Sequence, residues 1–141
     1  MNSFKDILRK IAASLPFALT KNLAYDRQTT QIMSLVLRET SNCIDIGCHK
    51  GEMLEQMLEF APKGSHFGFE PIPHFFNYLE DNFKGMATFY QVALSEQEGE
   101  VIFNYVVSNP AYSGIEQREY PKEEQIDKIK VTTAPLDSLI P

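Results

Sequence analysis

The chain has 141 residues, of which 43% are hydrophobic, and its 13 basic and 19 acidic side chains give a net charge of −6. A chain of this length buries one sizeable core, so we expect a single domain over residues 1–141, with residues 1–40 as a helical segment within it. No Lys/Arg block is longer than a pair, which argues against nucleic acid as a partner.

The sequence also gives no sign of a membrane protein. No apolar run approaches the length of a membrane-spanning helix, and charged residues interrupt the apolar stretch that a signal peptide would need. We therefore expect a cytoplasmic protein without membrane contact. The spacing of Cys43 and Cys48 suits neither a zinc knuckle nor a redox pair, so both are predicted to be reduced structural thiols, and no metal site is expected.

Two helices are predicted before the first strand. Apolar residues recur at helical spacing from Phe4 to Leu15, and Pro16 ends that segment. A second helix is expected to begin at Asp26, a residue type that caps helix N-termini, and to run towards Thr40.

Strands and helices then alternate along the chain. Short apolar runs predict strands at residues 42–47, 65–70 and 87–94. Helical spacing predicts one helix over 52–60 and another from Pro73 until Gly85. This β-α-β-α-β order predicts a parallel sheet with right-handed crossovers, the first half of a Rossmann-like, doubly wound α/β fold.

The pattern changes after the third predicted strand. A turn around Glu98 and Gly99 leads into residues 100–107, which are predicted to form an antiparallel neighbour of that strand or a hairpin arm. Residues 108–127 are predicted to be a long polar loop of a functional or mobile kind. A last strand at 128–136 and a short helix over 136–140 complete the prediction.

The first strand ends in an Asp-Gly motif that resembles a ligand-binding loop. Asp45, Gly47 and Gly51 fall at the strand-to-helix turn, where backbone N–H groups and the positive end of the next helix are expected to face a ligand. Gly47 would permit the turn, and Gly51 would let the helix start lie close to the strand. Because Asp45 would repel a pyrophosphate, the motif favours a nucleoside that bears a cationic amino-acid group. Glu70 ends the next strand, about twenty residues further on, where an acidic side chain can accept ribose hydroxyls.

These motifs, namely "CIDIGCHKG", "FGFEPIPHFFNYLEDNF", "FYQVALSEQEGEVIFNYV" and "VTTAPLDSLI", resemble the FkbM family of S-adenosylmethionine-dependent methyltransferases. The resemblance runs from about Tyr25 to the end of the chain. It implies that the methionine part of S-adenosylmethionine is held by the glycine loop, the ribose by the "FEP" strand end, and the adenine near the end of the third strand. The implied cofactor-binding residues are Asp45, Gly47, Cys48, His49, Gly51, Glu70, Pro71, Ala93 and Leu94, although family members commonly have Ala-Asn in place of Cys48-His49.

The resemblance also implies an acceptor and a longer sheet. It suggests O-methylation of a small or carbohydrate-like acceptor, and the family pattern continues past "LDSL" into strands that this chain does not contain. We therefore expect a truncated methyltransferase sheet whose first strand has an uncovered apolar edge. Such an edge predicts self-association, unless the N-terminal helix covers it.

No catalytic residue is identified from the sequence. His49, His66 and His74 are the candidate bases, but each fits a structural or surface role better. Tyr112, Ser113 and Glu116 in the long loop could touch an acceptor. Two alternatives stay open: a catalytically inert cofactor-binding or interaction module, and a dinucleotide-dependent oxidoreductase half-domain. The second is disfavoured by Asp45 and by the lack of Gly-x-Gly-x-x-Gly.

Overall fold

The computed structural model describes residues 21–140, and the chain divides into two compact units, one up to Arg38 and one from Glu39. The helix predicted over residues 4–15 lies outside the described residues. In the first unit, α2 spans Lys21–Val36, so it begins before Asp26 and ends before Thr40. The expectation that Asp26 caps this helix is wrong, because good helix formers such as Ala24 extend it towards the N-terminus. Asp26 lies inside the helix, and its carbonyl accepts the Thr30 hydroxyl at 2.9 Å.

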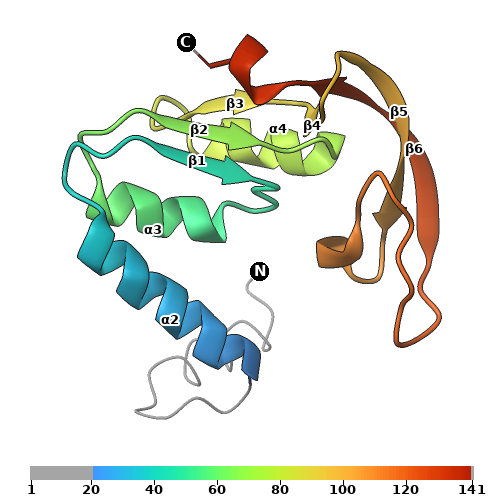
Figure 1. Cartoon of the computed structure of the whole chain (residues 1–141), viewed down its shortest axis with the longest axis horizontal. Helices are drawn as coiled ribbons and strands as arrows, with labels where there is room; N and C mark the ends of the chain where they lie inside the picture. Colours follow the sequence, from blue (N-terminus) through green and yellow to red (C-terminus); the bar gives the residue numbers. More distant parts are fainter. Residues whose placement is uncertain (1–20, 141) are drawn as a thin grey trace. The chain divides into compact units, whose positions relative to one another are not determined.

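The second unit contains the predicted parallel sheet. Its strands are β1 (Cys43–Ile46), β2 (His66–Phe69) and β3 (Thr88–Tyr90), in the order β1-β2-β3 (Figure 1). The connections are α3 (Glu52–Phe60) and α4 (Pro73–Asn82). This arrangement is the first half of a Rossmann-like sheet, as the sequence predicts.

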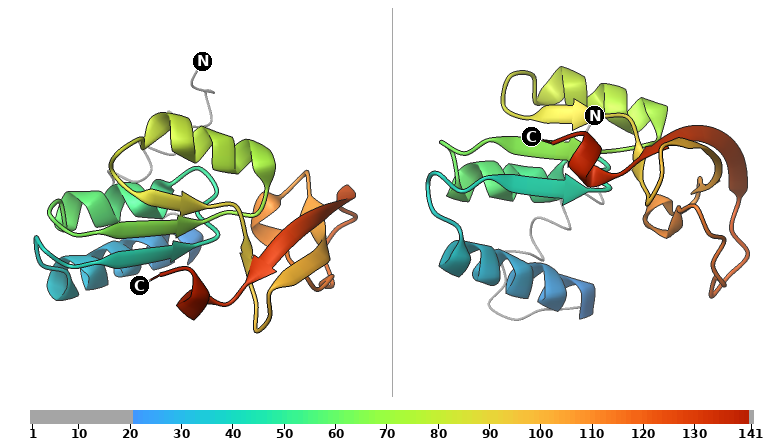
Figure 2. Two further views of the ribbon diagram at one scale, coloured as in Figure 1. Left: turned by 90° about the horizontal axis from the view of Figure 1, so that it is seen from above. Right: turned by 45° about the horizontal axis from the view of Figure 1, so that its top comes forward.

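One hydrophobic cluster holds α3 and α4 to the same face of this sheet (Figure 2). Leu54 of α3 and Leu79 of α4 are completely buried. Gly68 in the middle strand makes the close packing possible, since a Cβ there would lie 2.7 Å from both the Cys48 Sγ and the Phe89 ring. The cluster therefore packs the first turn of α3 and the C-terminal part of α4 against the sheet. Its buried members are Cys48, Leu54, Leu79, Phe83 and Phe89.

A second three-stranded sheet corrects the sequence prediction for residues 87–107. Its strands are β4 (Ala93–Leu94), β5 (Gly99–Val106) and β6 (Ile126–Ala134), in the order β4-β6-β5. The run 87–94 is thus two strands in two different sheets, β3 and β4. The antiparallel arm exists, but its partner is β6 and not the third strand, because β6 pairs with all eight residues of β5.

The segment between β5 and β6 folds back onto β5. Asn104 and Gly114 exchange backbone hydrogen bonds of 2.9 and 3.1 Å, and the Val106 N–H donates to the Ser113 hydroxyl. The segment contains one short 3₁₀ helix, η1 (Pro110–Tyr112). The predicted helix near the C-terminus is η2 (Leu136–Ser138), and the Tyr90 hydroxyl donates to the carbonyl of Leu139 just after it. Within residues 21–140, no helix has the length and apolar character needed to cross a membrane.

Candidate cofactor-binding site

The loop between β1 and α3 has an unusual backbone. Gly47 and Gly51 both have φ of 80°, and His49 has φ of 52°, so three residues are in the left-handed region. A Cβ on Gly47 would meet nothing within 4 Å, whereas one on Gly51 would lie 2.6 Å from the Phe83 ring. Gly51 therefore serves the packing of α4, and the expected close approach to the strand is wrong. Of the two loop glycines, Gly47 is the one with open space in front of it.

The N–H groups of this loop are used within the fold. Gly47 and Cys48 both donate to the Phe69 carbonyl, at 2.8 and 3.2 Å, and Gly51 donates to the Cys48 carbonyl at 2.7 Å. The His49 N–H donates to a side chain, the Glu70 carboxylate, at 2.8 Å. The expectation of ligand-facing amides at these positions is therefore wrong. A phosphate-binding loop needs such N–H groups free.

Glu70 is the residue that joins this loop to β2. Its side chain is buried, one carboxylate oxygen accepts from His49, and the other accepts from the Ile72 N–H at 2.9 Å. Pro71 has no N–H, so Ile72 provides the first available donor after the strand. Burial raises the pKa of Glu70, and the two N–H donors partly offset that rise. Since each carboxylate oxygen has two acceptor sites, Glu70 can hold the loop and still accept from a ligand.

Asp45 carries a polar atom without a partner. It pairs in register with Gly68, which places its side chain on the helix-covered face of the sheet. Its residue surface is 8% exposed, and its Oδ2 is buried with no hydrogen-bond donor. Burial raises the pKa of Asp45, while a hydrogen bond from the Cys48 side chain lowers it. A buried carboxylate oxygen without a donor is costly, so this atom fits a site that receives a cationic group.

Cys48 is the second buried side chain of the loop. Its thiol donates to the Asp45 carbonyl, with a sulfur–oxygen distance of 3.2 Å. Burial, aided by the Asp45 charge, raises the pKa of this thiol well above its ordinary value. Cys48 therefore stays a neutral thiol near neutral pH. Cys43 is also buried and unpaired, in agreement with the predicted structural role of both cysteines.

An aromatic group connects the loop to the second sheet. The Phe75 ring of α4 contacts the rings of both His49 and His74, with a centroid distance of 4.0 Å in each case. The His74 Nε2 lies 3.4 Å from the Tyr105 hydroxyl of β5. Burial lowers the pKa of His49, so its imidazole is neutral near pH 7. The sequence gives no sign of this group, because its members come from three distant segments.

The structure brings most of the predicted site residues together but leaves two outside. Asp45, Gly47, Cys48, His49 and Glu70 are connected by the contacts above, and Pro71 is buried beside Glu70. Ala93 and Leu94 lie in β4 of the second sheet, where Ala93 packs in a cluster with Ile72 and Phe75. His66 is buried at the start of β2 with its Nε2 bonded to the Ala61 carbonyl, so it is a structural residue.

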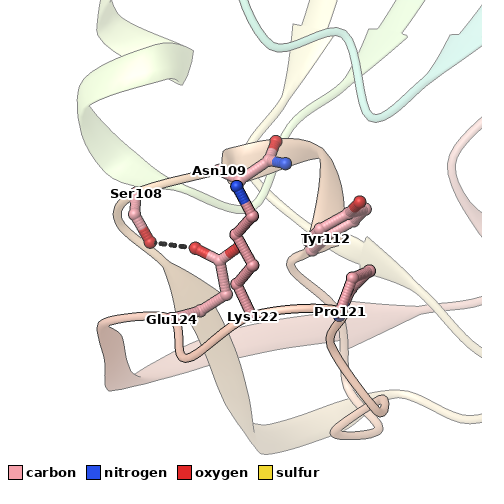
Figure 3. Close-up of a pocket in the computed structure, with 6 residues that line it drawn as sticks. All are labelled: Ser108, Asn109, Tyr112, Pro121, Lys122 and Glu124. Atoms are coloured by element: carbon pink, nitrogen blue, oxygen red, sulfur yellow. Dashed lines mark hydrogen bonds between the residues drawn. The ribbon is translucent and has the colours of Figure 1, made fainter.

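A pocket among the described residues lies elsewhere. It is formed by the segment between β5 and β6, and none of its lining residues belongs to the glycine loop (Figure 3). We place the candidate cofactor site at the glycine loop because that is where the buried unpartnered carboxylate lies. Among residues 21–140, no group of three or more His, Cys, Asp or Glu side chains could hold a metal ion.

Comparison with known proteins gives little further information. No family model matches the chain, and no curated protein matches it. A solved structure of a provisionally named rRNA methylase from Clostridium thermocellum aligns with a TM-score of 0.46 and 13% identity. The alignment covers 55% of this chain and 43% of that one, so the chain spans less than half of the neighbour's length. The strand order and helix positions, and not this neighbour, define the chain as an α/β protein with a Rossmann-like half-sheet.

Proposed function

We propose that residues 39–141 form the cofactor-binding part of an S-adenosylmethionine-dependent methyltransferase similar to the FkbM family. The observation that carries the proposal is the buried, unpartnered Asp45 Oδ2, which belongs to the strand end two residues before the open backbone at Gly47. A carboxylate in that position suits the ammonium group of S-adenosylmethionine. The cofactor supplies an activated methyl group, so the protein has to bind it and orient the acceptor.

The loop hydrogen bonds favour this cofactor over a dinucleotide. Gly47, Cys48 and Gly51 donate their N–H groups to carbonyls of the fold, which leaves them unable to bind a pyrophosphate. A buried carboxylate at Asp45 would also repel a phosphate group. A nucleoside with a cationic amino-acid group meets neither obstacle.

The residue roles within this proposal follow from the contacts. Asp45 and Gly47 would hold the amino-acid end, and Glu70 would hold the loop and accept from the ribose. His49 and Pro71 would border the nucleoside, and Ala93 and Leu94 would border the adenine only if β4 approaches the loop in the bound state. O-methylation of a small or carbohydrate-like acceptor remains part of the proposal, resting on the resemblance alone.

Calorimetric titration tests the proposal. S-adenosylhomocysteine should bind the chain, and NAD should not. Asp45→Asn should weaken binding of S-adenosylhomocysteine by on the order of 1–3 kcal/mol, because it removes a charged hydrogen-bond acceptor. Asp81→Asn, at an exposed position of α4, is the matched control and should bind like the wild type. Binding of NAD in preference, or equal binding by Asp45→Asn, would contradict the proposal.

A catalytically inert binding module is the second candidate. It shares the cofactor site, and the observation that favours it is the structural use of Glu70, whose two oxygens already accept N–H donors. Glu70→Gln separates the roles. If Glu70 only holds the loop, the variant should lose folding stability and cofactor affinity in proportion. If Glu70 also binds ribose, affinity should fall further than stability, which urea unfolding and titration measure independently.

A further inference from the structure

The segment between β5 and β6 encloses a pocket of about 310 Å³ (Figure 3). Its volume is at the lower end of the range for small-molecule sites, so it suits a ligand of amino-acid size. Three of its lining residues come from the chain just after β5, and three come from the chain that leads into β6. They are Ser108, Asn109, Tyr112, Pro121, Lys122 and Glu124.

Hydrogen bonds and ring stacking hold the pocket walls in place. The Ser108 hydroxyl donates to the Glu124 carboxylate, and the Gln125 N–H donates to the same hydroxyl oxygen. The Tyr112 ring stacks on the Tyr120 ring with a centroid distance of 5.8 Å and an interplanar angle of 27°. The Tyr120 hydroxyl is buried there without a partner. These contacts join the two sides of the loop.

The pocket presents one cation and one anion that do not pair with each other. Lys122 and Glu124 both line it, yet no ion pair joins them within the described part of the chain. Glu124 keeps acceptor capacity after its bond with Ser108, because a carboxylate has about four acceptor sites. Figure 3 shows the Lys122 side chain running past the Glu124 carboxylate towards Asn109, with Tyr112 and Pro121 on the other side of the pocket. Tyr112 and Pro121 provide the apolar wall.

We infer that this pocket binds a small zwitterion of the α-amino-acid type. The ligand carboxylate would pair with Lys122, its ammonium would pair with Glu124, and its side chain would lie against Tyr112 and Pro121. A simple anion would meet the Glu124 charge and a simple cation would meet the Lys122 charge, so only a ligand with both charges satisfies the two side chains. The inference is independent of the proposed cofactor site, since it uses no residue of the glycine loop.

A ligand series on the unaltered protein tests the inference. We would titrate ¹⁵N-labelled chain with L-phenylalanine, with phenethylamine, which lacks the carboxylate, with 3-phenylpropionate, which lacks the ammonium, and with methyl glucoside as a neutral polyol. L-phenylalanine should shift the amide signals of residues 108–124, and each single-charge analogue should bind about fivefold more weakly. Equal binding of all three aromatic compounds, no binding, or preference for the glucoside would overturn the inference.

Charge-removing variants then assign the two contacts. Lys122→Met should abolish the preference for L-phenylalanine over phenethylamine, and Glu124→Gln, which keeps an acceptor for Ser108, should abolish the preference over 3-phenylpropionate. Lys128→Met and Glu123→Gln are matched controls, because both positions are exposed and neither lines the pocket. The control variants should retain both preferences. Loss of the preferences in the controls, or their persistence in Lys122→Met and Glu124→Gln, would count against the assigned contacts.

Discussion

Asp45 is the residue at which folding and the proposed function oppose each other. Burial holds its pKa above the ordinary value, so the folded chain binds a proton at this carboxyl more tightly than the unfolded chain does. The stability from that proton is present below the unfolded pKa and is lost as the pH rises through the raised, folded pKa. Near neutral pH, the charged and buried Asp45 carboxylate therefore lowers the free energy of unfolding.

This opposition predicts a stabilising substitution. Asp45→Asn removes the buried charge and leaves in place the backbone carbonyl that accepts the Cys48 thiol, so we expect the free energy of unfolding at about pH 7 to rise by roughly 1 kcal/mol. The gain should shrink as the pH falls towards about 4, because the raised pKa of Asp45 favours proton uptake by the folded wild-type chain. Urea unfolding at both pH values measures it, with Asp81→Asn as the control. A destabilised Asp45→Asn chain would show that the carboxylate is structural. Stabilisation together with lost S-adenosylhomocysteine binding is the pattern of a functional residue.

The two loop glycines have the same φ but different surroundings, and this predicts unequal costs. Either Gly→Ala change places a side chain at φ of 80°, which costs about 1–2 kcal/mol. At Gly51 the new methyl group would also lie 2.6 Å from the Phe83 ring, which adds roughly 1–3 kcal/mol of overpacking. Gly51→Ala should therefore lower the free energy of unfolding clearly more than Gly47→Ala.

The affinity for S-adenosylhomocysteine should give the reverse order. Among folded chains, Gly47→Ala should lose more affinity than Gly51→Ala. A methyl group on Gly47 would enter the open space in front of the loop, where the proposed ligand lies, so the folded Gly47→Ala chain should bind S-adenosylhomocysteine more weakly than the wild type. Calorimetry below the unfolding temperature of each variant measures this affinity. Unchanged affinity in Gly47→Ala would place the ligand elsewhere.

At the scale of elements, α4 is the connection between the glycine loop and the second sheet. Phe75 contacts the rings of His49 and His74, and it also belongs to the cluster that contains Phe103 and Val131 of β5 and β6. Phe75→Leu and Phe103→Leu remove rings of similar burial from this cluster, so each should cost roughly 1–2 kcal/mol of stability.

Only one of these two substitutions should perturb the structure of the glycine loop. Phe75→Leu removes the surface against which His49 packs, so the amide signals of residues 47–51 should shift and S-adenosylhomocysteine affinity should fall. Phe103→Leu makes the same change in the same cluster without contact to His49, and it should leave the loop signals in place. Equal loop perturbation by both variants would mean that the cluster responds as a whole.

The elements predicted correctly from sequence are those decided by local pattern. Apolar spacing over residues 52–60 gives the bounds of α3, and Pro73 marks the start of α4, because helix periodicity and N-terminal proline act within a few residues. The division of residues 87–94 between two sheets could not be predicted in this way. That outcome depends on Ala93 pairing with Thr133 of β6, forty residues further along the chain.

The candidate site shows the same limit. Asp45, the loop glycines and Glu70 can be identified from their positions at strand ends. The hydrogen bonds of the loop N–H groups cannot be predicted in this way. They depend on the Phe69 carbonyl and the Glu70 carboxylate, which reach the loop from the neighbouring strand. The ring of Phe75 lies against His49, but the sequence predicts Phe75 only as a core residue of α4.

At the scale of the molecule, the unpaired edge of β1 is the surface where we expect self-association. Within residues 21–140, β1 pairs with β2 alone. Its Ile44 and Ile46 lie on the sheet face opposite α3 and α4 and are 39% and 64% exposed. An apolar strand with unpaired backbone groups is a template for pairing with another chain. The expectation of self-association therefore has a defined location, the β1 edge.

A charged residue at this edge should prevent such pairing. We expect the sedimentation-average mass of the wild-type chain to rise with concentration, and Ile46→Lys to keep it close to the monomer value, because lysine on an edge strand opposes strand addition. Met86→Lys is the matched control, since Met86 is 57% exposed but lies outside every strand. A wild-type chain that stays monomeric, or an equal effect of Met86→Lys, would remove β1 as the association surface. An effect confined to Ile46→Lys would mean that a further strand adds at the β1 edge, so that whatever pairs with β1 lies on the strand that carries Asp45.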